Sequence, residues 1–158
     1  MTLLNLKQEP QHLPVLAAWH HAEWTHLNPG RSLQDRIQSM QAYLNDDQIP
    51  STFIHRRDGQ LTGSAALVDC DMDTRADLTP WLASVFVAPD YRRQGIGSEL
   101  VRQVMKAAVQ AGFEKLYLFT PDQVGFYQAL GWCIMEHTTY RDCPVTVMCV
   151  CLRDAHWT

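Results

Sequence analysis

At 158 residues the chain has the length of one ordinary domain with a single core. Hydrophobic residues make up 46% of it and charged residues 19%, a balance typical of a globular protein rather than a disordered one. The formal net charge of −4 argues against a nucleic-acid binder, which normally presents a basic face. We expect a cytoplasmic protein without a membrane partner, because no apolar run reaches the length of a membrane span and the first residues lack a signal-peptide pattern.

The first half of the chain predicts a strand, two helices and a β-hairpin. Apolar residues recur at helical spacing in two stretches, and Ser32 is placed to cap the second helix. Two strands follow, joined by Asp58-Gly59, which is a strong signal for a two-residue hairpin turn. The expected ranges are 1–6 (strand), 13–24 and 32–44 (helices), and 51–57 and 60–68 (strands).

The centre of the chain predicts a buried strand, a basic turn and a long amphipathic helix. Residues 81–87 are apolar apart from Ser84, which is typical of a strand covered on both faces. From Ile96 onward the apolar residues recur at helical spacing, and Gly112 is positioned to end the helix.

The basic turn has two arginines followed by two glycines at the mouth of the helix. Gly95 and Gly97 let the backbone bend tightly and let an anion approach its N–H groups. Those N–H groups have no partners inside the helix, and the helix dipole adds positive potential there. Arg92 and Arg93 raise that potential further, so the turn predicts a cradle for a phosphate or pyrophosphate. A turn that uses its glycines for geometry alone is the alternative.

Two common phosphate-binding motifs do not fit this turn. A Rossmann fingerprint needs a small residue where Leu100 stands, and no Gly-Lys-Ser/Thr of a P-loop occurs. What fits is Arg-x-x-Gly-x-Gly after a strand ending Val-x-Pro, carried by 85–97, VFVAPDYRRQGIG. In this motif the chain resembles the GNAT superfamily of N-acetyltransferases. A second stretch, 125–132 (GFYQALGW), resembles the Phe-Tyr-x-x-Leu-Gly-Phe segment of that family, with Trp132 in place of the usual phenylalanine.

The remaining elements complete an α/β (α+β) pattern. Strands are expected over 115–120, 132–140 and 145–152 and a short helix over 122–130, with a turn around Asp142-Cys143-Pro144. A helical crossover makes the strands before and after the long helix parallel. The resemblance implies a mixed, mostly antiparallel sheet with helices on both faces, in which that central parallel pair splays to admit the pantetheine arm of coenzyme A. We expect 1–158 to form one acyl-CoA N-acyltransferase domain.

The resemblance implies an enzyme that moves the acetyl group of acetyl-CoA to a primary amine. Its motif makes Tyr127 the acid that protonates the departing thiolate, and an ordinary phenol pKa near 10 keeps that group protonated at neutral pH. A half-buried packing tyrosine is the alternative. The N–H of Phe86 or Val87 would stabilise the oxyanion. The residues expected to hold the cofactor are Phe86, Val87, Arg92, Arg93, Gln94, Gly95, Ile96, Gly97, Ser98 and Tyr127, although Ser98 could simply cap the helix.

The sequence offers several candidates for the general base and no single assignment. Many relatives carry a glutamate on the central strand, where this chain has Trp81-Leu82-Ala83-Ser84. We expect Ser84 to act by ordering a water that relays the proton. Direct attack by the amine is favoured over an acyl-enzyme, since no cysteine lies in a Cys/His nucleophile context. The other candidate bases are His20, His21, Glu23, Asp71, Asp73 and Glu136.

The cysteine spacing, an acidic loop and the closing strands give the remaining expectations about metals, the acceptor and oligomeric state. The five cysteines include no Cys-x-x-Cys pair, so we expect reduced thiols and no metal. The resemblance implies a small-molecule or peptide amine as acceptor, and the acidic loop at Asp69, Asp71 and Asp73 favours a cationic one. The closing strands, ending Cys-Val-Cys-Leu, are expected to offer an edge that could pair between the subunits of a homodimer. A non-catalytic acyl-CoA binding or sensing module, or a domain for another nucleotide, remains the alternative.

Overall fold

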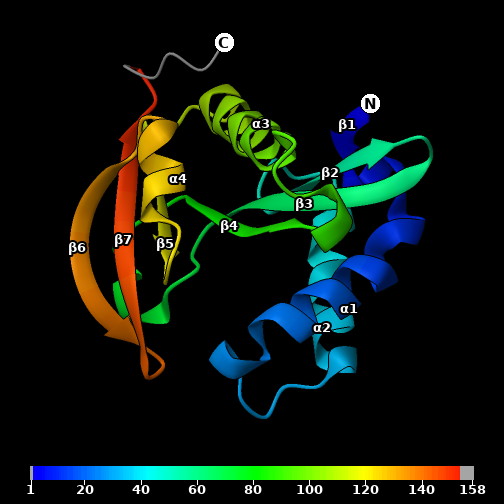
Figure 1. The fold of residues 1–158 in the computed structure, drawn as a ribbon, viewed down its shortest axis with the longest axis horizontal. Helices are drawn as coiled ribbons and strands as arrows, with labels where there is room; N and C mark the ends of the chain where they lie inside the picture. The colour runs from blue at the N-terminus through cyan, green and yellow to red at the C-terminus, as the bar shows by residue number, and fades with distance from the viewer. Residues whose placement is uncertain (1, 154–158) are drawn as a thin grey trace.

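The computed structural model describes residues 2–153 as a seven-stranded sheet with helices on both faces (Figure 1). The strand order is β1-β2-β3-β4-β5-β7-β6, and each neighbouring pair is antiparallel except β4 and β5, which are parallel. This arrangement confirms the predicted mixed sheet. The strands are β1 (Thr2–Asn5), β2 (Ser51–Arg57), β3 (Gln60–Val68), β4 (Trp81–Val87), β5 (Lys115–Thr120), β6 (Cys133–Tyr140) and β7 (Cys143–Cys151).

Four α-helices cover the two faces of the sheet. They are α1 (Leu13–Trp24), α2 (Leu33–Met40), α3 (Ile96–Gln110) and α4 (Val124–Ala129). Strand β2 shows how the faces divide: the side chain of Ile54 packs with α1 and α2, whereas that of its neighbour Phe53 packs with α3. Successive side chains of a strand point to opposite faces, so α1 and α2 cover one face and α3 the other. None of the helices within 2–153 is both long enough and apolar enough to cross a membrane.

The central parallel pair separates after a single point of register. Strands β4 and β5 are aligned at Trp81 and Tyr117. Further along β4, a register shift against β3 coincides with Ser84, whose φ of 53° is in the left-handed region. One extra residue on one strand of a pair bends that strand and increases its twist. The bulge at Ser84 therefore directs the second half of β4 away from β5, which produces the splayed pair that the family resemblance implied.

Local sequence signals fixed several boundaries correctly. Asp58 and Gly59 have φ values of 52° and 78°, as a hairpin turn with two left-handed residues requires. Ser32 caps α2 by accepting a hydrogen bond from the Asp35 N–H, at 3.1 Å. Gly112, with φ of 91°, follows the end of α3 as predicted.

Other boundaries differ from the prediction. The turn between β6 and β7 is Arg141-Asp142, both left-handed, rather than Asp142-Cys143-Pro144, so β7 begins at Cys143. The second helix ends at Met40 and continues as a 3₁₀ turn, and α4 is shorter at both ends than expected. Of the two closing strands, β6 is at the edge of the sheet, whereas β7, which carries the Cys-Val-Cys-Leu end, lies between β5 and β6. Met1, part of the predicted first strand, lies outside the described residues.

Candidate active site

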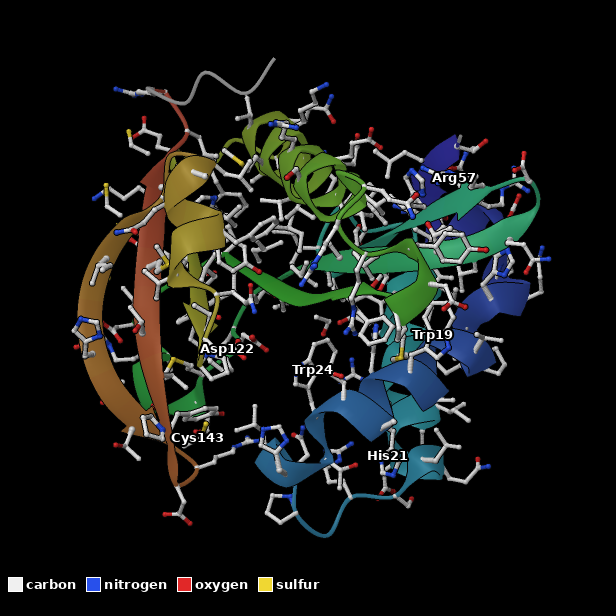
Figure 2. The ribbon with its side chains drawn as sticks, viewed as in Figure 1. Trp19, His21, Trp24, Arg57, Asp122 and Cys143 are labelled. Carbon is white, nitrogen blue, oxygen red and sulfur yellow. The ribbon has the colours of Figure 1, made fainter. Side chains whose placement is uncertain are left out.

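A cavity of about 880 Å³ opens where β4 and β5 separate. Its wall combines the mouth of α3 and residues of α4 with side chains from α1, α2 and the loop after β3, so it passes from one face of the sheet to the other. Figure 2 shows Trp24 reaching from α1, and Asp122 from just after β5, toward this central region. A cavity that crosses a sheet can receive one molecule from each face, which is the geometry that a two-substrate transfer needs.

The turn before α3 leaves the first N–H groups of that helix without a side-chain cap. The N-cap residue is Gly95, with φ of 83°, and no side chain accepts a hydrogen bond from the first turn. Ser98 lies inside the helix, so the structure gives it no capping role. Uncapped N–H groups and the positive end of the dipole form a site for an anion. The turn residues on the cavity wall are Arg92, Arg93, Gly95, Ile96, Gly97 and Ser98.

Gln94 is the one expected cofactor residue that does not line the cavity. Its side chain accepts a hydrogen bond from Arg57 and donates one to the Asp90 carbonyl oxygen, at 3.4 Å. These bonds hold the turn against the β2–β3 hairpin. The side chain of Gln94 thus contacts protein groups, and only its backbone belongs to the turn that faces the cavity.

Strand β4 presents one free edge to the cavity. The N–H of Ala88 donates to the Thr62 carbonyl at 2.8 Å, and Phe86 is aligned with Ser64, so alternate residues of β4 direct their backbone groups to β3. Val87 lies between them, and the alternation turns its N–H toward the gap, while its carbonyl oxygen accepts a hydrogen bond from Nε of Arg92 at 2.9 Å. Of the two expected oxyanion donors, the geometry therefore favours Val87 over Phe86, while the Phe86 side chain remains on the cavity wall.

Tyr127 lies on the cavity wall with only 8% of its surface exposed. Its ring packs edge-on against Phe126 and Trp132, with centroid distances of 4.9 and 6.1 Å. Burial raises the pKa of Tyr127 well above its usual range, and the nearby charge of Asp122 adds to the rise. Across residues 2–153 we find no hydrogen-bond partner for the Tyr127 hydroxyl. It is a protonated donor in the cavity with its hydrogen uncommitted.

Ser84 is the end of a chain of polar side chains. Arg36 donates from Nη2 to the Ser84 hydroxyl at 3.2 Å and to Nδ1 of His20 at 2.8 Å, and Nε2 of His20 lies 2.9 Å from the Ser64 hydroxyl. Burial, with a further contribution from the charge of Arg36, lowers the pKa of His20 to about 3. His20 is therefore neutral, accepts at Nδ1 and donates from Nε2 to Ser64. With both nitrogens engaged, it has no free position to take a proton from a substrate.

Among the candidate bases, Asp71 is the acidic residue whose carboxyl pKa is changed most by its surroundings. It is half-buried on the cavity wall, and burial raises the pKa of its carboxyl to about 7 even though Arg36 and Arg141 act to lower it. A carboxylate with a pKa near the working pH is well suited to general-base catalysis. Glu23 also lines the cavity, but its side chain is exposed.

The other candidate bases are engaged elsewhere or lie off the cavity. Asp73 accepts from Arg141 at 3.2 Å, and Glu136 forms an ion pair with Arg75. His21, labelled in Figure 2, is not part of the cavity wall. Asp71 and Glu23 are therefore the predicted bases that the structure places beside the cavity.

Arg36 and Arg141 line the cavity although no sequence motif indicated them. Arg141 donates to the Leu27 carbonyl and to the Asn28 side chain, both at 2.8 Å, and so joins the β6–β7 turn to the segment after α1. Within the described part of the chain, no group of three or more His, Cys, Asp or Glu side chains is placed to hold a metal ion.

The fold and the cavity place the chain in the class of acyltransferases. It belongs to the acetyltransferase (GNAT) family, whose model matches residues 13–132. The amino-acid acetyltransferase of Pasteurella multocida (strain Pm70) is 36% identical over 80 residues, which cover 51% of this chain and 17% of that protein. The chain thus spans about a sixth of that curated relative.

Solved structures share the fold at low sequence identity. Ribosomal-protein-alanine N-acetyltransferase from Brucella melitensis superimposes with a TM-score of 0.76 at 17% identity, covering 96% of this chain and 99% of that one. The putative acetyltransferase yncA from Salmonella typhimurium, solved with its cofactor acetyl-CoA, gives a TM-score of 0.70 at 17% identity, covering 99% and 95%. At this identity the likeness concerns the fold.

Proposed function

We propose that this protein transfers the acetyl group of acetyl-CoA to a primary amine on a small molecule or peptide. The observation that carries the proposal is one continuous cavity that joins an uncapped helix mouth to the Tyr127 hydroxyl across a split sheet. The relative from Pasteurella and the neighbour from Brucella are both named for acetyl transfer to amino acids or to a protein alanine, which supports an amine acceptor.

The cofactor would lie along the wall built by β4 and α3. The N–H groups of Ile96, Gly97 and Ser98, with Arg92 and Arg93 beside them, fit a pyrophosphate. The edge of β4 that faces the gap, with the Val87 N–H on it, fits the amide-bearing pantetheine arm, which can pair with it as an added strand does. This direction of the arm brings the thioester toward the gap between β4 and Tyr127.

In the transfer, the amine nitrogen attacks the thioester carbonyl carbon while both substrates are bound. A carbon–nitrogen bond forms, the carbonyl oxygen becomes an oxyanion, and the N–H of Val87 stabilises it. The carbon–sulfur bond then breaks and the sulfur accepts a proton from Tyr127, while the attacking nitrogen, which still carries two hydrogens, loses one of them to restore the Tyr127 hydroxyl through water. Because burial raises the pKa of Tyr127, it donates only once negative charge has developed on the sulfur in the same dry surroundings.

The proton of the ammonium form goes to Asp71, directly or through a water. Asp71 has a pKa near 7, so about half of it is ionised at neutral pH and ready to accept. Ser84 accepts from Arg36 and keeps its own hydrogen for another partner, so it can hold that water in place. Ser84 is thereby a positioning residue, and Asp71 the base, in this scheme.

Two measurements test the proposal. Isothermal titration of acetyl-CoA, with ATP and NAD as controls, should show binding of acetyl-CoA alone. Release of coenzyme A thiol in the presence of a panel of primary amines should then exceed the release without them. Binding without amine-dependent release would identify a sensing module instead, and equal binding of the three nucleotides would refute the cradle.

A further inference from the structure

Arg36 places a positive charge on the cavity wall, and among residues 2–153 no carboxylate forms an ion pair with it within 4.0 Å. Arg36 projects from α2, and its two hydrogen bonds go to neutral acceptors, Nδ1 of His20 and the Ser84 hydroxyl. Its Nε is buried without a partner.

Burying a guanidinium without an anion is costly. Burial lowers the pKa of Arg36, but a guanidinium stays protonated in proteins, so its charge remains and calls for a counter-charge. Asp71 attracts Arg36 from the cavity wall but is itself partly protonated at neutral pH. Arg141, the other arginine in this half of the cavity, is already paired with Asp73. The site that lacks an anion is therefore at Arg36.

From these contacts we infer that the acceptor carries a carboxylate in addition to its amine, and that Arg36 binds that carboxylate. The inference rests on the proposed acetyl transfer. Arg36 is held by Ser84, three residues before the Val87 N–H on the same strand. At about 3.3 Å per residue, a carboxylate on Arg36 lies within roughly 10 Å of the thioester carbonyl. Because the bulge at Ser84 shortens this path, about 10 Å is an upper limit, and a free amino acid is small enough to lie within it with its amine at the thioester.

This inference reverses the preference for a cationic acceptor that the acidic loop suggested. Asp73 is paired with Arg141, and Asp69 does not line the cavity, so two of the three loop carboxylates do not face the acceptor. The third, Asp71, suits the amine end of the acceptor. A polyamine would bring a second positive charge toward Arg36, where it would be repelled.

Matched acceptors test the inference. Free L-amino acids and their carboxamides, with spermidine as a cationic acceptor, are compared by kcat/KM for coenzyme A release. The best amino acid should exceed its carboxamide by at least about 10-fold, since a hydrogen bond to a charged group contributes about 1.5–3 kcal/mol. Equal values for acid and amide, a preference for spermidine, or no turnover of any amino acid while acetyl-CoA still binds would overturn the carboxylate site.

Variants of Arg36 separate charge recognition from structure. Arg36→Gln should raise KM for the amino acid by about 10- to 100-fold and lower the acid-to-amide ratio toward one, and Arg36→Lys should retain part of the preference. Arg31→Gln, at an exposed arginine just before the same helix, is the matched control and should keep the ratio. An equal loss for acid and amide in Arg36→Gln would show a structural role only.

Titration of acetyl-CoA against each protein keeps the two proposals apart. Acetyl-CoA should bind wild type and Arg36→Gln with similar affinity, because the guanidinium lies at the acceptor end of the cavity. If wild type fails to bind acetyl-CoA, the proposed function is refuted and the carboxylate site with it. If acetyl-CoA binds but acid and amide react alike, only the carboxylate site is refuted.

Discussion

Gly97 offers the sharpest test of the helix mouth, because a side chain there would enter the space where the cofactor is proposed to bind. A Cβ at this position would lie 3.4 Å from Cζ of Phe126 and 3.7 Å from Cγ2 of Val87, which is ordinary contact. A Cβ is therefore accommodated at this position, and Gly97→Val would extend two further methyl groups between α3 and those cavity-lining side chains. Loss of one or two charge-assisted hydrogen bonds at about 1.5–3 kcal/mol each predicts a Kd for acetyl-CoA raised by roughly 10- to 10⁴-fold.

The matched control for this substitution is Gly125→Val. Gly125 is also in the first turn of a helix and does not line the cavity, and a Cβ added there would meet no atom within 4 Å. Thermal unfolding should show both variants folded, and isothermal titration should show weakened acetyl-CoA binding for Gly97→Val alone. An unchanged Kd in a folded Gly97→Val protein would refute the cradle, because the proposed contacts could not survive the added methyl groups.

Two further predictions concern the chemical step. Tyr127→Phe should lower kcat by about 10²- to 10⁴-fold with little change in the Kd of acetyl-CoA, and an unchanged kcat would assign protonation of the thiolate to water. The kcat/KM of wild type should rise as pH increases through about 7, because Asp71 must lose its proton to act as base, and Asp71→Asn should abolish that rise. Because the pKa of Asp71 is raised from 3.8 to about 7 on folding, its contribution to stability should fall as pH rises between these two values and stay constant above them. The Tm of Asp71→Asn relative to wild type should therefore be higher at pH 8 than at pH 5, and identical pH dependence of Tm in the two proteins would contradict this.

Elements that depend on local chemistry were predictable from the sequence. Asp58-Gly59 and Gly112 need left-handed backbone, and Ser32 supplies a helix cap, so each sets a boundary by its own residue type. The β6–β7 turn was misplaced because Pro144 suggested a loop, whereas Arg141 and Asp142 adopt the left-handed conformation without a glycine.

In the candidate site, too, features that lie together in the chain were predictable and features brought together by folding were not. The helix mouth is contiguous in the chain, so its motif identified it, although Gln94 points away to Arg57. Arg36 lies on a short helix and would pass for a solvated charge, and only folding brings it to Ser84, 48 positions away. The raised pKa of Asp71 likewise arises from burial by distant segments, which no spacing in the sequence reports.

The bulge at Ser84 determines which backbone N–H groups of the second half of β4 face β3 and which face the gap. Successive residues of β4 direct their amides alternately toward β3 and toward the gap, and Phe86 faces β3. The number of residues between the bulge and Pro89 therefore decides which amide faces the gap. Deleting one residue there would rotate the Val87 amide into the ladder with β3 and offer the gap a different backbone position. The four residues between Ser84 and Pro89 therefore cannot lose or gain one without exchanging the two edges of the strand.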